Sequence, residues 1–132
     1  MTQEDKELLL KDLCSRLPYG VKCYNRNTEE VFTLSEATDT TDTSNVSFDY
    51  GYCDINYIQP YLRPMSSMNG KELAEYKTLE KQCEILPTFA YISVSKCILF
   101  DWLNAHHFDY RGLIEKGLAI EVTEENNPYK KE

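Results

Sequence analysis

The spacing of apolar residues changes near residue 20, and this change constrains the fold more than any other feature of the sequence. Over residues 3–17, leucines recur every three or four positions, which predicts an amphipathic helix. After Pro18-Tyr19-Gly20, residues 21–24 and 31–34 are short apolar stretches joined by a polar turn, which is typical of a β-hairpin. The chain must therefore combine helices with antiparallel strands.

Further strands are predicted downstream. Residues 38–45 are small and polar, which favours a surface loop, whereas residues 48–53 alternate in strand fashion with an aromatic face. Pro60 and Pro64 lack a backbone N–H, so the segment between them suits an edge strand or an extended crossing better than a central strand. Residues 118–122 are predicted to form a closing strand.

Three helices are predicted in the second half of the chain. Asn69 and Glu72 have the spacing of a capping box, at the start of a helix that runs to about Cys83. Residues 95–106 carry the strongest apolar stripe and are predicted to form the core helix. A short helix over 110–116 should follow.

The length and the order of these elements indicate one domain. A chain of 132 residues is the size of a typical single domain, and 42% hydrophobic residues are too many for a disordered chain. Helices and strands are interspersed without regular βαβ alternation. We therefore predict one small α+β domain over residues 1–122, with a small, mostly antiparallel sheet packed with three to four helices, and a frayed polar tail over 123–132.

The composition narrows the possible partners. A net charge of −8 argues against sequence-independent binding to nucleic acid, which requires lysine and arginine to neutralise phosphates. No apolar run reaches the length of a membrane span, and the acidic start is unlike a signal peptide, so we expect a cytoplasmic protein that does not bind membranes. The five cysteines match no metal-site spacing, so we expect free buried thiols and no cofactor.

Three stretches together resemble a group of short uncharacterised proteins from phages and mobile elements of gut anaerobic bacteria. They are LLLKDLCSRLPYGV at 8–21, YLRPMSSM at 61–68 and LNAHHFDYRGLIEKGLA at 103–119. The resemblance implies a phage-type protein in a bacterial cytoplasm, but it implies no catalytic or binding residues.

Two arginines are candidates for binding an anion such as a nucleotide phosphate. Arg111, beside Tyr110, stands at the start of the predicted short helix, where backbone N–H groups are free to contact a phosphate. Asp109 would oppose this by capping the same N–H groups. Arg63, held between two prolines, is the second candidate, and an exposed structural arginine is its alternative interpretation.

A metal site is also conceivable at His106, His107 and Asp109, because two imidazoles and a carboxylate are ligand types that zinc or iron accepts. Adjacent histidines on a helix point about 100° apart, so both could bind one metal only if the helix ends there. In the alternative interpretation, His106 closes the apolar stripe, His107 faces water and Asp109 caps the next helix.

Four tyrosines within twelve residues are candidates for an interface, because tyrosine offers a large rigid surface with a polar tip. They are Tyr50, Tyr52, Tyr57 and Tyr61. The same side chains would equally suit the edge of a core.

No phosphate-binding loop, nucleophile elbow or metalloprotease motif occurs, so the sequence favours a binding protein over an enzyme. Our leading hypothesis is a small phage-type accessory protein that binds a protein partner or its own copy through the tyrosine-rich strand. A binder of a small anionic ligand and a metal-dependent enzyme centred on the histidines are the alternatives.

Overall fold

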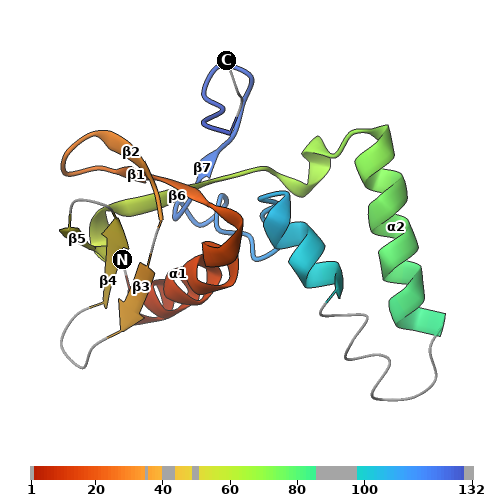
Figure 1. Ribbon diagram of the computed structural model, residues 1–132, viewed down its shortest axis with the longest axis horizontal. Coiled ribbons are helices and arrows are strands. Elements are labelled where there is room, and N and C mark those ends of the chain that lie inside the picture. The colour runs from red at the N-terminus through yellow and green to blue at the C-terminus, as the bar shows by residue number, and fades with distance from the viewer. Residues whose placement is uncertain (1, 35, 40–43, 49–50, 86–97, 130–132) are drawn as a thin grey trace.

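The structure, a computed structural model, describes residues 2–34, 36–39, 44–48, 51–85 and 98–129, with only the backbone described for 36–39, 44–48, 51–54 and 83–85. The chain forms a single small α+β domain (Figure 1), as predicted. One end holds the sheets and the first helix, and the other end is the helix α2.

The N-terminal helix and the hairpin are confirmed. Helix α1, Gln3–Arg16, begins with a capping box in which Thr2 and Asp5 exchange side-chain to backbone hydrogen bonds. A 3-10 turn, Leu17–Tyr19, follows and ends at Gly20, whose φ of 67° is accessible to glycine without strain. Strands β1, Lys22–Asn25, and β2, Glu30–Thr33, then pair antiparallel.

The main sheet has the strand order β2-β1-β6-β7 and is mixed. Strand β6, Ile58–Leu62, runs antiparallel to β1, whereas β7, Ile120–Glu121, runs parallel to β6. The prediction of an edge strand around Pro60 is therefore wrong, because β6 lies inside the sheet. The proline is tolerated because the two residues of β7 pair with Tyr61 and Leu62, so Pro60 stands outside that ladder.

A second sheet corrects two further predictions. Its antiparallel strands, in the order β3-β4-β5, are β3, Glu36–Asp39, β4, Ser44–Phe48, and β5, Gly51–Asp54. The predicted loop over 38–45 thus overlaps two strands, whose pairing satisfies the backbone groups for which the small polar side chains compete. The predicted strand over 48–53 is divided between β4 and β5, and residues 40–43 and 49–50 lie outside the described part.

The hydrophobic core lies between α1, the main sheet and the segment 113–119. Cys23 within it is a buried free thiol, as predicted, whereas Cys14 is exposed, so the prediction of buried thiols is wrong at that position. The members of the core are Leu9, Leu13, Val21, Cys23, Leu34, Ile55, Ile58, Leu62, Leu113, Leu118 and Ala119. Ile55 belongs to a 3-10 turn, Ile55–Tyr57, that leads into β6.

The helix over residues 98–105 is not the core helix that its apolar stripe predicted. Leu103 is buried, but Ile98 and Phe100 are about half exposed. The helix lies between the sheet end of the molecule and α2, Gly70–Ile85 (Figure 1). Some of its apolar side chains therefore face the sheet end of the molecule or α2, and others are exposed. Residues 95–97 of the predicted helix lie outside the described part.

Helix α2 begins as predicted. The Asn69 N–H donates to the Glu72 carboxylate at 3.0 Å, and the Glu72 N–H donates to Oδ1 of Asn69 at 2.8 Å, which completes the capping box. A 3-10 turn, Met65–Ser67, connects β6 to this helix.

The predicted short helix over 110–116 is not formed, because Gly112 has a φ of 75°, outside the helical region. The Asp109 carboxylate instead accepts hydrogen bonds from the backbone N–H groups of Leu113, at 2.9 Å, and Ile114, at 3.0 Å. The segment is thus a series of turns organised by Asp109. The closing strand shortens to the two residues of β7.

The prediction of a frayed tail is wrong at Tyr129. Its hydroxyl donates to the Tyr61 carbonyl at 2.7 Å and accepts from the Lys22 N–H at 3.0 Å. These bonds anchor the C-terminal segment to β1 and β6.

Candidate functional site

A pocket of about 690 Å³ opens beside the helix over 98–105. The turn after β6, helix α2 and the turns organised by Asp109 contribute its other walls. Its lining residues are Pro64, Met65, Ser66, Tyr76, Leu99, Phe100, Leu103, Asp109, Tyr110, Gly112, Ile114, Glu115 and Glu121.

The walls of this pocket are aromatic and apolar. The rings of Phe100 and Tyr110 lie 5.3 Å apart and are tilted by 42°, so they form an aromatic corner. Phe100 is 44% exposed although it is a large apolar side chain. Leu99 and Ile114 extend the apolar surface. A ligand with an apolar part would therefore cover surface that now faces water.

The charges on this pocket are negative. Glu115 and Glu121 are exposed, and within the described residues neither carboxylate forms a hydrogen bond or an ion pair. The Asp109 carboxylate is already bonded to two backbone N–H groups. The pocket therefore offers two available carboxylates beside aromatic rings, which is a chemistry that attracts cations.

A buried charge cluster supports the Tyr110 side of the pocket. Nε of Arg16 donates to Oδ2 of Asp12 at 2.8 Å, and Nη1 of Arg111 donates to Oδ1 of the same carboxylate at 2.8 Å. Asp12 and Arg16 are both fully buried. One carboxylate thus serves two guanidinium groups.

Tyr110 is held in place by this cluster. The guanidinium carbons of Arg16 and Arg111 lie 5.3 Å and 4.7 Å from the centre of its ring, and its hydroxyl donates to Oδ1 of Asn104 at 2.9 Å. Arg111 also donates to the Ser15 hydroxyl at 3.2 Å. The sequence hypothesis that Arg111 and Tyr110 bind an anion is not supported by this geometry, because both side chains are engaged internally.

Arg63 has a structural environment as well. Its Nη1 and Nη2 atoms each donate to Glu72 at 2.7 Å, and its guanidinium lies 4.3 Å from the centre of the Phe108 ring. The hydrogen bond from Arg63 lowers the pKa of Glu72. Arg63 therefore joins β6 to the start of α2, and it shares no partner with Arg111.

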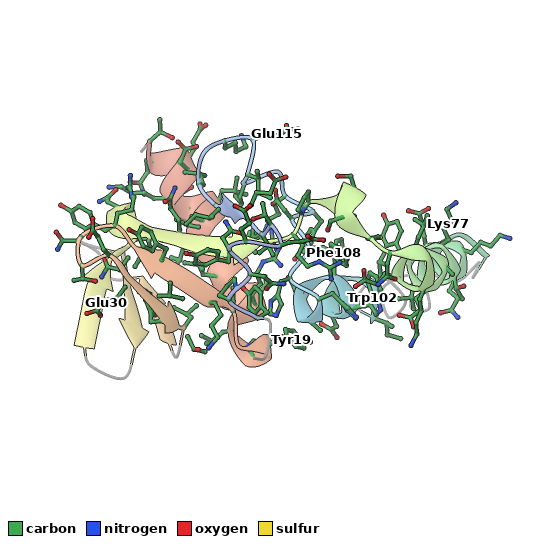
Figure 2. The ribbon with its side chains drawn as sticks, turned by 90° about the horizontal axis from the view of Figure 1, so that it is seen from above. Tyr19, Glu30, Lys77, Trp102, Phe108 and Glu115 are labelled. Carbon is green, nitrogen blue, oxygen red and sulfur yellow. The ribbon has the colours of Figure 1, made fainter. Side chains whose placement is uncertain are left out.

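The two histidines point to different neighbours. Nδ1 of His106 lies 2.8 Å from the Trp102 carbonyl, whereas the His107 ring stacks on Tyr129 with centres 3.8 Å apart. Figure 2 shows Trp102 and Phe108 side by side in this region, between the sheets and α2. No group of three histidine, cysteine or acidic side chains in the described residues could hold a metal ion. The hypothesis of a metal site at His106, His107 and Asp109 is therefore not supported.

No protein-family model, curated protein or solved structure matches this chain.

The predicted tyrosine interface is not assembled by the described residues. Tyr57 is 45% exposed, but Tyr61 is nearly buried in β6. Tyr50 lies outside the described part, and only the backbone of Tyr52 is described. Of the four tyrosines, Tyr57 alone is shown to present surface to a partner.

The sequence reasoning missed Asp12, Arg16, Phe100, Glu115 and Glu121. A signal existed for the first two, because charged residues at positions 12 and 16 lie on the same face of the first helix as the leucines. The pocket residues gave no comparable signal, since their proximity depends on how distant elements pack.

Within the described residues, no helix is long and apolar enough to cross a membrane.

The His107 side chain predicts a pH dependence of stability. Burial, reinforced by Arg16, lowers the pKa of His107 from its ordinary 6.5 to about 4. Between pH 6.5 and 4 the unfolded chain binds a proton that the folded chain does not, so this side chain lowers the free energy of unfolding by about 2 kcal/mol as the pH falls through that window. Urea denaturation at pH 7 and pH 4.5 measures this change.

The matched variant is His107→Asn, because asparagine tolerates the φ of 63° at this position and does not titrate. It should lose less stability than the wild type between the two pH values. Equal losses in both proteins would contradict the assignment to His107.

Proposed function

We propose that this chain is a binding protein whose pocket beside the helix over 98–105 captures a cationic side chain, flanked by an apolar one, from a partner protein. The observation that supports this proposal is the combination of the Phe100–Tyr110 aromatic corner with the two available carboxylates of Glu115 and Glu121. Together with the resemblance to phage and mobile-element proteins, this leads us to propose an accessory protein of that setting, active in the bacterial cytoplasm.

The charges of the molecule favour such a partner. The net charge of −8 attracts a basic protein over long range, and carboxylates at the pocket favour a positive group over a negative one. The aromatic corner adds affinity for a cation and for the alkyl part of its side chain. The pocket is therefore better suited to arginine or lysine next to a leucine than to a nucleotide phosphate.

Contacts within the protein hold the pocket in its shape before a ligand binds. Tyr110 is fixed by Asn104 and two arginines, and Tyr76 belongs to α2, whose start is fixed by Arg63 and Glu72. A preformed site avoids much of the ordering cost of binding. This geometry supports recognition of a partner.

Titration with two capped peptides tests the proposal. One contains leucine followed by arginine, and the other contains leucine followed by glutamate. The protein should bind the arginine peptide roughly tenfold more tightly, because two exposed ion pairs replace two repulsions. Backbone amide shifts in NMR spectra locate the binding at the pocket.

Variants separate the two parts of the site. Combined Glu115→Gln and Glu121→Gln should abolish the preference for arginine, whereas Phe100→Ala should weaken binding of both peptides. The matched control is Glu124→Gln with Glu125→Gln, which removes the same charge from exposed positions outside the pocket. If this control loses the preference equally, net charge and not the pocket is responsible.

A further inference from the structure

Among the residues that the structure describes, two buried nitrogen atoms near the C-terminal segment have no hydrogen-bond partner. They are Nη1 of Arg16 and Nδ1 of His107. Arg16 is fully buried, and its Nη1 carries two donor hydrogens. Because buried polar groups are almost always hydrogen-bonded, and an unpartnered charged donor is especially costly, these atoms point to a missing acceptor.

The Arg16 side chain extends from α1 to the turn that contains His107. Nη2 of Arg16 donates to the Phe108 carbonyl at 2.6 Å, and His107 is the residue directly before Phe108. The Tyr129 ring covers His107 at an angle of 9°, and its hydroxyl is bonded to β1 and β6. The anchored C-terminal segment thus covers the imidazole from the outside.

The Asp12 cluster, taken by itself, has a surplus of positive charge. Arg16 and Arg111 are positive, and their common partner Asp12 supplies one negative charge. The Tyr110 ring contacts both guanidiniums but carries no net charge. A surplus positive charge in the interior is unfavourable unless a counter-charge lies close by.

The charged groups that act on His107 have the same sign. Arg16 of α1, the adjacent His106 and Arg63, which follows β6, each lower its pKa, after burial itself. These neighbours place a positive potential at the imidazole, which a negative group would offset.

From these contacts we infer that Arg16 and His107 form an internal site for a small monovalent anion of the chloride class. Both unpartnered atoms can donate, namely the Nη1–H of Arg16 and, in the matching tautomer, the Nδ1–H of His107. A single negative charge balances the surplus of the Asp12 cluster. A monatomic ion accepts both bonds without a required orientation.

NMR of the two imidazoles tests this inference, and the chain provides its own control because it contains two histidines. His106 is the reference, since its Nδ1 is already bonded to the Trp102 carbonyl. The wild-type protein at pH 7 is titrated with sodium chloride and, at matched ionic strength, with sodium gluconate. We expect the His107 nitrogen signals to shift in a saturable way with chloride alone, while the His106 signals stay unchanged.

Thermal unfolding provides a second measurement. At a chloride concentration ten times its dissociation constant, the ratio of folded to unfolded protein should rise about elevenfold over gluconate. His107→Asn should reduce this rise, and Arg16→Lys, which removes the forked donor, should abolish it. Identical responses to the two salts in the wild type would overturn the inference and leave buried water as the partner of both nitrogens.

Discussion

Replacing Asp12 with asparagine is expected to lower the free energy of unfolding by about 3–5 kcal/mol, because it leaves two guanidinium groups without their shared carboxylate. Arg16 is completely buried, so bulk water cannot replace the carboxylate as its hydrogen-bond partner. Arg111 would keep the Ser15 hydroxyl as a partner but would lose its ion pair. Urea denaturation followed by circular dichroism measures the loss.

The matched control for this substitution is Glu7→Gln. It removes the same charge from the same helix, but Glu7 is exposed and its hydrogen bond with Gln3 lies on the surface. We expect it to change the stability by less than about 0.5 kcal/mol. If Asp12→Asn is equally mild, the cluster does not stabilise the interior as its geometry indicates.

Replacing Phe108 with alanine is expected to lower the free energy of unfolding by about 3–5 kcal/mol, since it creates a cavity at the junction of three elements. The fully buried ring stacks on Trp102, with centres 5.7 Å apart, and lies beneath the Arg63 guanidinium. Its backbone forms an isolated parallel bridge with Arg63, next to the end of β6. The substitution should therefore loosen the attachment of the helix over 98–105 to the main sheet.

Phe100→Ala is the control, because Phe100 has the same side chain on the same part of the chain but is half exposed. It should cost less than about 1 kcal/mol in stability while it weakens peptide binding at the pocket. Losses of equal size from the two substitutions would contradict the central position of Phe108. Thermal unfolding and the peptide titration distinguish the two roles.

The residues that stabilise the fold and the residues proposed to bind the partner form neighbouring but separate groups. Asp12, Arg16 and Arg111 lie behind Tyr110, whereas Phe100, Glu115 and Glu121 face the pocket. Figure 2 shows Glu115 at the margin of the molecule and Phe108 near its centre. Substitutions at the pocket can therefore be studied in a folded protein.

The elements that depend on local signals could be predicted from the sequence. The first helix, the first hairpin and the capping box at Asn69 and Glu72 are present as predicted, because each depends on residues within a few positions of one another. The α+β class followed from the same local periods.

Local signals failed where distant contacts or a single backbone angle decided the structure. The two-residue length of β7 lets Pro60 lie inside the sheet, and Gly112 with a positive φ replaces the predicted helix by turns. Tyr129 is fixed by hydrogen bonds to residues 68 and 107 positions away in the sequence, which no local composition indicates.

The partners of the charged side chains were decided by the tertiary structure alone. Arg111 meets Asp12 across 99 positions of the chain, and Arg63 binds Glu72, which the sequence presented as a helix cap. The two arginines that the sequence presented as ligand-binding candidates are thus engaged within the protein. A buried charge is stable only beside an opposite charge, and here the fold supplies that partner. For the same reason, the carboxylates of the pocket, Glu115 and Glu121, are identified as available groups only when the packing shows that no cation of the described chain pairs with them.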